Sequence, residues 1–243
     1  MCSRFDLDID IRAFQIQLGL EIENITHMRR PGDTNDDNNA PKGTDSDGDG
    51  EDNIDNAGNI DQEAAFDGLT GTRRPTDPVA VILPRRKAGI RYWGLTIPGR
   101  STPLINARAE TLAQKSTFRP LLNRRCLIPA NGWYEWRKDG KVKFKNRITL
   151  PDHQPFLFAG LENGREVTII TCAPSGSIAH IHNRMPAVIG PNHLMDWLTP
   201  ELDYSKIAHM LGPLPDHVLS WHEERPDRNG CEQACHQINL FSK

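Results

Sequence analysis

Residues 132–145 read GWYEWRKDGKVKFK, and this stretch does most to decide the fold class. Aromatic and β-branched residues stand on both sides of the pair Asp139-Gly140. An Asp-Gly pair between two such segments is typical of the tight turn of a β-hairpin. We therefore predict that residues 124–130 and 132–145 form a hairpin, with Asp139-Gly140 as its turn.

Further strands are predicted on both sides of this stretch. Short apolar runs that end at turn residues are typical of strands, and they lie at residues 79–83, 89–98, 155–161 and 167–173. The last two runs are separated by only four residues, 162–165, which predicts a second hairpin.

Helices are predicted to be few. Apolar residues recur at helical spacing over residues 7–20, where Gly19 is expected to end the helix, and over the short segments 191–198 and 204–211. The whole pattern predicts an α+β single domain built on a mixed, largely antiparallel β-sheet or barrel with short helices.

Residues 31–70 are strongly acidic, with ten Asp and two Glu against the single Lys42, a net charge of -11. The whole chain carries -3, so the rest of it carries +8, which suggests a polyanionic partner. Residues 31–63 are poor in large apolar side chains, and we interpret them as a disordered, solvated loop. We expect one domain over residues 1–225, interrupted by the insertion 31–70, and a tail over 226–243.

The composition excludes several classes of protein. No window approaches the roughly 18 consecutive apolar residues of a membrane-spanning helix, and the first ten residues, MCSRFDLDID, do not read as a secretory signal. The five cysteines, at positions 2, 126, 172, 231 and 235, are odd in number and mostly far apart. That pattern favours a reducing compartment over a disulfide framework. We expect a cytoplasmic monomer with no membrane partner.

Cys2 gains a special chemistry if Met1 is removed. The chain then begins with an α-amine and a thiol on adjacent carbon atoms, the amine partly neutral and the thiol a source of thiolate near neutral pH. Such a 1,2-aminothiol attacks an aldehyde through nitrogen to form a Schiff base, and the thiol then closes a five-membered thiazolidine ring. The alternative is that a cysteine at position 2 has no function.

Three other positions suit a catalytic or anion-binding site. Asn106 and Arg108 lie two apart, so they point to one face of an extended segment, where Arg binds phosphate well; the alternative is a helix start capped by Asn106. Glu135 lies between two aromatic residues, which raises a carboxyl pKa and suits an acid or base, unless it is an exposed residue of an edge strand. His182 titrates in the useful range, although a single histidine is more often structural.

Six short motifs follow one another in a characteristic order. They are Cys2-x-Arg4-Phe5, Trp93-Gly94-Leu95, Asn106-x-Arg108-x-Glu110-Thr111, Arg125-Cys126-x-x-Pro129, Gly132-Trp133-Tyr134-Glu135-Trp136 and His182-x-Arg184-Met185-Pro186. In this combination the chain resembles the SRAP family, the SOS-response-associated peptidase-like or abasic-site processing proteins. The resemblance covers the first 30 residues or so and residues 71–200 approximately.

The resemblance implies a sensor of abasic sites in single-stranded DNA, which forms a covalent thiazolidine crosslink that protects the lesion during the DNA damage response. By position, Cys2 corresponds to the crosslinking nucleophile, Glu135 to the acid/base and His182 to the catalytic histidine. Asn106 corresponds to the residue that orients the α-amine. The resemblance also implies weak AP lyase activity, a family classification as a peptidase or hydrolase, and a nucleoid-associated location.

The resemblance implies DNA-binding residues as well. Arg108 corresponds to a phosphate-binding arginine, and Arg4, Trp93 and Thr171 to positions that line a DNA channel, with Trp93 as a surface on which unpaired bases stack. No cofactor and no metal are implied. The chain departs from the family pattern at Ser3, where Gly is usual, and at Asn131, where Asp is common.

Three other functions remain open from the sequence. One is a cysteine-type (auto)peptidase that uses Cys2. A second is calcium binding by residues 45–50 (DSDGDG), which resemble the start of an EF-hand loop, although the twelfth position is Asn56 rather than Glu. A third is zinc binding by Cys231, Cys235 and His236, whose spacing is loose for such a site.

Overall fold

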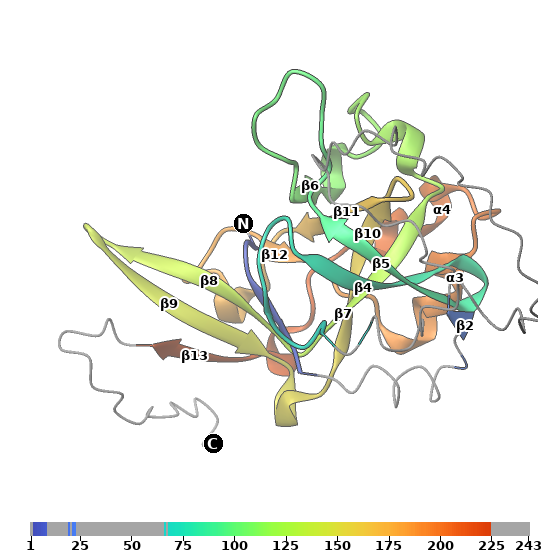
Figure 1. The fold of residues 1–243 in the computed structure, drawn as a ribbon. Coiled ribbons are helices and arrows are strands. Elements are labelled where there is room, and N and C mark those ends of the chain that lie inside the picture. The colour runs from blue at the N-terminus through green and yellow to red at the C-terminus, as the bar shows by residue number, and fades with distance from the viewer. Residues whose placement is uncertain (1, 9–18, 20, 23–65, 67, 225–243) are drawn as a thin grey trace, which may run out of the picture.

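Two β-sheets form the framework of the protein (Figure 1). The computed structural model describes residues 2–8, 19, 21–22, 66 and 68–224. One sheet is built around a closed ring of strands, and the other is an open sheet that carries the N-terminal strand.

Five strands close the ring: β4 (Pro78–Leu83), β5 (Lys87–Trp93), β7 (Arg125–Ala130), β10 (Phe156–Glu162) and β11 (Glu166–Cys172). Neighbours in the order β5-β4-β7-β10-β11 pair antiparallel, and β11 pairs in parallel with β5 to complete the barrel. Three short strands extend this sheet: β2 (Glu21–Ile22) on β5, and β6 (Asn106–Arg108) and β12 (Met185–Pro186) on β11. The mixed, largely antiparallel barrel predicted from the sequence is confirmed.

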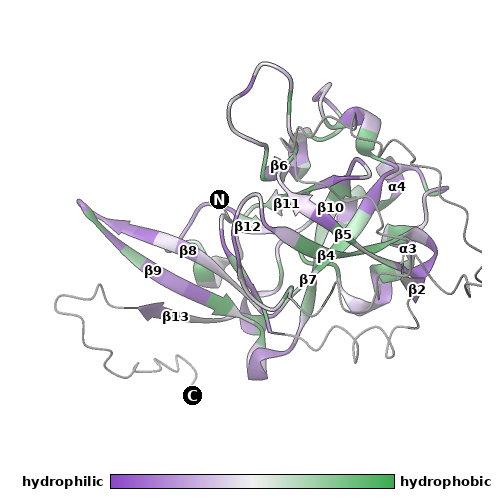
Figure 2. Ribbon diagram, in the orientation of Figure 1, coloured by the Kyte–Doolittle hydropathy of each residue, from purple (hydrophilic) through white to green (hydrophobic). Residues whose placement is uncertain are grey.

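The second sheet has the strand order β13-β9-β8-β1-β3. Its strands are β1 (Phe5–Leu7), β3 (Gly71–Arg73), β8 (Gly132–Asp139), β9 (Val142–Thr149) and β13 (Ser220–Glu224). The β8–β9 hairpin reaches away from the barrel, to the left in Figure 1. Figure 2 shows green, apolar ribbon along β4 and β7, whereas the outer half of this hairpin is mostly purple, or polar. Its buried residues lie toward its base, so the base contributes to the core.

Helices are short and lie in the connections. The α-helices whose bounds lie within the described residues are α3 (Leu194–Leu198) and α4 (Tyr204–Ile207). Single 3-10 turns lie at Pro84–Arg86, Ala109–Thr111, Arg119–Leu121, Pro151–His153, Gly176–Ile178, Pro191–His193, Ala208–Met210 and Asp216–Val218. Among the helices of the described residues, none has both the length and the apolar character that crossing a bilayer requires.

An aromatic cluster joins the two sheets. Phe5 of β1 contacts Trp93 and Phe158 edge to face, with ring centroids 5.1 and 5.7 Å apart, and Trp133 of β8 packs on Phe158 at 6.1 Å. All four side chains are fully buried. Pairs of this kind contribute about 1 kcal/mol each beyond the area they bury. The cluster therefore anchors the N-terminal strand, and Cys2 with it, to the barrel.

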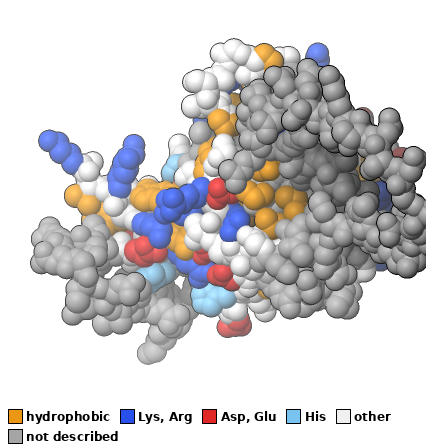
Figure 3. Space-filling view, viewed as in Figure 1, with side chains coloured by type: hydrophobic (Ala, Val, Ile, Leu, Met, Phe, Trp, Pro, Cys, Tyr) orange, Lys and Arg blue, Asp and Glu red, His pale blue; other side chains and the backbone are white. Residues whose placement is uncertain are grey.

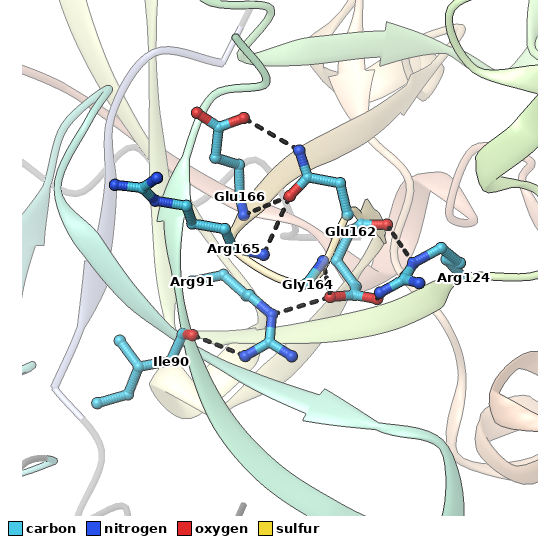
Figure 4. Close-up of polar contacts among 8 residues, drawn as sticks. Ile90, Arg91, Arg124, Glu162, Gly164, Arg165 and Glu166 are labelled. Carbon is cyan, nitrogen blue, oxygen red and sulfur yellow. Dashed lines mark hydrogen bonds and ion pairs between the residues drawn. The ribbon is translucent and has the colours of Figure 1, made fainter. Parts of the chain in front are cut away.

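The turn between β10 and β11 is fixed to the barrel by a buried carboxylate (Figure 4). Glu162 accepts from Arg91 Nε at 2.9 Å and from the Gly164 amide at 2.6 Å, and Arg124 pairs with it at 2.8 Å. Because Arg91 lies on β5, this network braces the barrel where β5 meets β11. It lies away from the residues that the sequence marks as catalytic.

Several predicted elements need correction. Residues 124–130 and 132–145 do not pair with each other, since β7 pairs with β4 and β10, while β8 pairs with β9. The hairpin turn lies at Gly140-Lys141 because Asp139 still pairs with Val142. The strand predicted over residues 89–98 ends at Trp93. The remaining strands, 79–83, 155–161 and 167–173, are confirmed, and short helices occur within both predicted C-terminal segments.

The N-terminal predictions are tested only in part. Most of the helix predicted over 7–20 lies outside the described residues, but Leu7 is the last residue of β1. The loop predicted over 31–63 and the tail over 226–243 also lie outside them. Phe66 and Leu69 are buried in the core, so the expected insertion ends before Phe66 rather than at residue 70.

Candidate active site around Cys2

Cys2 lies just before β1, which is held between β3 and β8. The amide of Tyr134 donates to the Arg4 carbonyl at 3.0 Å and so continues the pairing of β8 toward the N-terminus. Cys2 is fully buried, and its Sγ lies 3.7 Å from the same Arg4 carbonyl oxygen. The N-terminal residue is therefore part of the packed structure rather than a loose end.

The thiol of Cys2 is held in its neutral form. Burial raises its pKa well above the ordinary value, and the negative charge of Glu135 raises it further. The sequence analysis expected a source of thiolate, and the structure corrects that expectation. The thiol therefore needs a base before it can act as a nucleophile.

Asn106 reaches Cys2 from the barrel. It is the first residue of β6, which pairs in parallel with β11 through Ile169 opposite Asn106. Its Nδ2 donates to the Cys2 carbonyl oxygen at 2.7 Å. Its Oδ1 is buried and accepts no hydrogen bond from the described residues. A buried acceptor beside the N-terminal residue is suited to bind an α-amine.

Gly94 makes this approach of β6 possible. It follows Trp93 with φ +127°, a conformation that favours glycine, and donates to the Val167 carbonyl at 2.7 Å. A Cβ at this position would lie 2.8 Å from a side-chain carbon of Pro103. Because Gly94 has no side chain, Pro103 can pack closely against it and the chain can turn back. The Ile105 carbonyl then accepts a hydrogen bond from Trp93 Nε1, and β6 begins at Asn106.

Glu135 lies in the middle of β8 and is buried. Burial raises the pKa of its carboxyl from 4.5 to about 7. It therefore exchanges a proton near neutral pH, as the aromatic flanks led us to expect. The alternative, an exposed residue of an edge strand, is excluded.

His182 faces Glu135 from the segment between β11 and β12. Its Nε2 lies 3.9 Å from Glu135 Oε2, while its Nδ1 lies 3.1 Å from the amide of Arg184, which donates to it. The same Nδ1 lies 3.2 Å from the Arg184 carbonyl oxygen, so the backbone of Arg184 fixes the orientation of the ring, and Nε2 points toward the Glu135 side. Burial lowers the pKa of His182, and the charges of Arg184 and Lys138 lower it further.

Arg184 is a residue that the sequence analysis quoted but gave no role. Its guanidinium makes a bidentate contact with Glu110 at 2.6 and 2.8 Å and donates to the Thr171 carbonyl at 2.6 Å. The short His182-x-Arg184 spacing was the feature of the sequence that could have indicated a role for Arg184 beside His182. Arg184 ties the histidine segment to β11 and to the turn that follows β6, so it positions His182 relative to Asn106.

Of the residues predicted to bind DNA, two have suitable positions. Arg108 is exposed in β6, two residues after Asn106 and on the same face of the strand. Arg4 stands over the ring of Trp136 at 5.5 Å and is partly exposed. Both guanidinium groups are therefore available to an anion beside Cys2.

The other two have positions that do not fit the expectation. Trp93 is fully buried in the aromatic cluster, with its indole nitrogen bonded to the Ile105 carbonyl, so it offers no ring face to a base. Thr171 is fully buried in β11, with its hydroxyl 3.4 Å from the Ala107 carbonyl. Both residues support the site from within the core. The sequence did offer a sign of this buried role, because Trp93 is apolar, Thr171 is β-branched, and both lie in predicted strands.

No group of three or more metal-ligating side chains occurs among the described residues. The segments considered for calcium and zinc, residues 45–56 and 231–236, lie outside them. The arrangement around Cys2 is thus an acid, a neutral imidazole and an amide gathered around one buried N-terminal residue. This set of groups is suited to carbonyl chemistry.

Comparison with known families assigns the chain to one of them. The family model of the SOS response associated peptidase (SRAP) matches residues 61–227. The chain belongs to the SRAP family. The family named from the six motifs is confirmed, and the match spans Asn106, Glu135 and His182.

Curated SRAP relatives carry a common description. The chain is 40% identical over 131 residues to "Abasic site processing protein YoaM" of Bacillus subtilis, which covers 47% of this chain and 58% of that protein. It is 34% identical over 144 residues to "Abasic site processing protein YedK" of Escherichia coli, which covers 54% and 64%. The matched part of the chain thus spans about three fifths of the length of these relatives.

Solved structures show a similar fold. A protein from Bordetella bronchiseptica superposes with a TM-score of 0.63 at 19% identity, covering 93% of this chain and 100% of that one. A protein from Bacteroides thetaiotaomicron gives a TM-score of 0.58 at 24% identity, covering 67% and 81%. At these identities the likeness is one of fold.

Proposed function

We propose that this protein processes abasic sites in single-stranded DNA, and that Cys2 forms a covalent thiazolidine with the lesion after Met1 is removed. The observation that carries the proposal is the gathering of Asn106, Glu135 and His182 around Cys2, from three separate elements. The curated relatives described as abasic site processing proteins support the same substrate.

The chemistry begins at nitrogen. Hydrolysis of the Met1–Cys2 peptide bond frees the α-amine, which attacks C1′ of the ring-opened deoxyribose aldehyde. Loss of water gives the imine. The thiol S–H then adds across the C=N bond: sulfur bonds to C1′ and nitrogen regains a proton. Atoms balance with water as the by-product, and no oxidant or reductant is needed.

Glu135 moves the protons. With a pKa of about 7 it is present in both forms near neutral pH, so it delivers a proton to the departing oxygen and accepts one from the thiol. The neutral Cys2 thiol requires such a base. His182, whose Nε2 faces Glu135, donates to the sugar oxygen when Nε2 carries a proton and so helps the ring to open.

Asn106 and the two arginines place the reactants. The amide of Asn106 holds the Cys2 carbonyl, and its free oxygen accepts from the α-amine, which directs the nitrogen lone pair outward. Arg108 and Arg4 bind phosphates on either side of the abasic nucleotide, and their contribution is expected to fall as salt rises.

The test is incubation with a single-stranded oligonucleotide that bears one abasic site, followed by denaturing electrophoresis. We expect a heat-stable adduct with the wild type, and much less with duplex or intact DNA. Cys2→Ser retains the amine but closes the ring poorly, so it gives only an imine that borohydride traps. A wild type that yields no adduct, with Met1 removal verified by mass spectrometry, contradicts the proposal.

Two further activities are separated by the same assay. The imine also permits β-elimination, so slow strand cleavage at the abasic site is expected as a side reaction. A cysteine peptidase requires a reactive thiolate, whereas burial and Glu135 keep this thiol neutral. Peptide hydrolysis in the absence of any DNA adduct would favour the peptidase instead.

A further inference from the structure

The outer end of the β8–β9 hairpin carries three exposed lysines, Lys138, Lys141 and Lys143, which we call the lysine tip. Neighbouring cations on the same hairpin are paired: Arg137 with Glu223, and Lys145 with Glu224, each within 2.9 Å. None of the three tip lysines forms an ion pair with a residue that the structure describes. Figure 3 shows Lys and Arg side chains standing out from this end of the hairpin.

The tip places like charges directly opposite each other. Lys138 of β8 pairs in register with Lys143 of β9, so their side chains lie on the same face. Like charges at directly opposed positions destabilise a sheet, and Lys141 in the turn adds to the repulsion. Within the hairpin itself, all of whose residues the structure describes, the only acid beyond Arg137 is Asp139, and its carboxylate lies 3.5 Å from Arg137 instead. An anionic ligand would relieve this repulsion.

Arg4 links the lysine tip to the surroundings of Cys2. Lys138 follows Glu135 by three residues on β8, so its side chain lies on the opposite face from Glu135 and on the same face as Trp136, over which Arg4 stands at 5.5 Å. The charge of Lys138 is close enough to contribute, after burial, to the lowered pKa of His182. A row of positive charge therefore runs from Arg4, two residues from the nucleophile, to the end of the hairpin.

The length of the hairpin sets its reach. A strand rises about 3.3 Å per residue, so Lys138 lies about 10 Å from Glu135 along β8 and the turn about 17 Å. A stacked strand carries one phosphate per about 3.4 Å of helix axis, so along that axis the lysine tip is level with phosphates about three to five nucleotides from the lesion.

We propose that the lysine tip binds the phosphate backbone of the DNA strand beyond the abasic nucleotide, on one side of it only. This inference rests on the proposed function, which supplies DNA as the ligand of the adjoining site. It adds a binding surface that serves affinity rather than chemistry.

The test measures equilibrium binding, apart from crosslinking. The probe is single-stranded DNA with a tetrahydrofuran analogue, which has no aldehyde and cannot form the adduct. The variants are K138Q/K141Q/K143Q and a control with the same charge change at exposed lysines elsewhere, K87Q/K115Q/K206Q. Each is titrated over a salt series with a long oligonucleotide and with one cut to about two nucleotides on each side, short of the reach estimated above.

We expect the tip variant to lower the slope of log K against log salt by about two on the long oligonucleotide, and by nearly nothing on the short one. Shortening only the 5′ side or only the 3′ side should abolish the difference in one case. The control variant should match the wild type. Equal slopes for tip and control variants, or equal losses on long and short DNA, overturn the proposal.

Two further measurements sharpen the test. Lys138→Glu creates an opposite-charge pair with Lys143, so it should raise the melting temperature while it weakens binding to the long oligonucleotide. A lower melting temperature together with weaker binding would show a merely structural role.

The vesicle experiment tests a different ligand. If anionic vesicles bind the wild type but not the tip variant, and the DNA slopes of the two proteins are equal, the tip binds a membrane surface and the proposal is overturned. Crosslinking of the short abasic oligonucleotide by the tip variant should persist, which separates failure of this inference from failure of the proposed function.

Discussion

The side-chain amide of Asn106 donates a 2.7 Å hydrogen bond to the backbone carbonyl of Cys2, across 104 positions of sequence. The bond joins the barrel, through β6, to the residue that begins the open sheet. Its geometry leaves Asn106 Oδ1 buried and free to accept from the N-terminal amine. Cys2 is thus contacted by a residue on a different sheet.

Asn106→Ala should slow crosslinking while leaving DNA affinity nearly unchanged. Losing a buried hydrogen bond costs about 1–3 kcal/mol, and here the loss falls on the orientation of the amine, so the rate should fall about tenfold to a hundredfold. Single-turnover rates with abasic DNA, beside affinities for the tetrahydrofuran analogue, measure the two effects. Asn123→Ala removes only a 3.4 Å contact with Arg125 and is the matched control. A parallel loss of rate and affinity would mean that Asn106 binds DNA instead.

Glu135 predicts a characteristic dependence of stability on pH. Its pKa in the folded protein is about 7, above its ordinary 4.5, so the folded state holds the proton more tightly than the unfolded state. This contribution is complete below pH 4.5 and is lost as pH rises through 7, a difference of about 3 kcal/mol. Urea unfolding at pH 5 and pH 8 should therefore show wild type losing more stability than Glu135→Gln, which has no charge to bury. Equal losses would contradict the raised pKa.

The same substitution predicts a kinetic effect. Steps that need the acid form of Glu135 should slow in the wild type above pH 7, as the carboxyl loses its proton. Glu135→Gln should be slower at every pH, by about a hundredfold to ten-thousandfold, and its rate should lack this inflection. Single-turnover crosslinking from pH 5 to pH 9 tests it. An unchanged inflection in the variant would assign it to another group.

The sequence predicted the local features of this site better than its assembly. Glu135 was expected to be a perturbed acid because its flanking aromatics are adjacent in sequence, and burial confirms the expectation. The pairing of residues 124–130 was predicted wrongly because both neighbouring segments suit an antiparallel partner, and only the closed barrel selects β4 and β10. The resemblance implied that Trp93 stacks on bases, but a tryptophan also suits a core, and here it is fully buried.

The polar contacts between residues far apart in the chain could not be predicted from the sequence. Asp6 accepts from Thr72, Tyr134 and Arg147, which are far apart in the sequence, and nothing in the residues around Asp6 indicates these partners. The N-terminal strand is fixed in place by this one carboxylate as well as by Phe5. The insertion boundary was misplaced for a related reason, since an isolated Phe66 in an acidic segment gives no sign that it reaches the core.

Asp6→Ala should destabilise the protein by about 3–5 kcal/mol. Asp6 is buried and ion-paired with Arg147 at 2.9 Å, and removing one partner leaves the other charge uncompensated. Asp139→Ala, which removes an exposed carboxylate 3.5 Å from Arg137, should cost less than about 1 kcal/mol. Urea unfolding midpoints compare the two. Similar small losses would show that Asp6 does not anchor β1.

Deleting residues 33–63 should leave crosslinking intact and tighten DNA binding. The segment holds nine Asp and two Glu against Lys42, so its removal changes the net charge of the chain from -3 to +7. A more positive protein attracts the phosphate backbone more strongly at low salt. The deletion stops before Phe66 and Leu69, which belong to the core, and a short Gly-Ser bridge replaces the segment.

A second variant separates the effect of charge from the effect of length. It keeps the length of the segment but changes each of its Asp and Glu residues to Asn and Gln. Affinities for an intact oligonucleotide over a salt series should rise alike in both variants and converge with wild type at high salt. Equal affinities of all three proteins at low salt would show that the acidic segment does not screen the DNA-binding face. A deleted protein that fails to fold would show that the segment supplies ordered structure, and would favour the calcium-binding interpretation of residues 45–56.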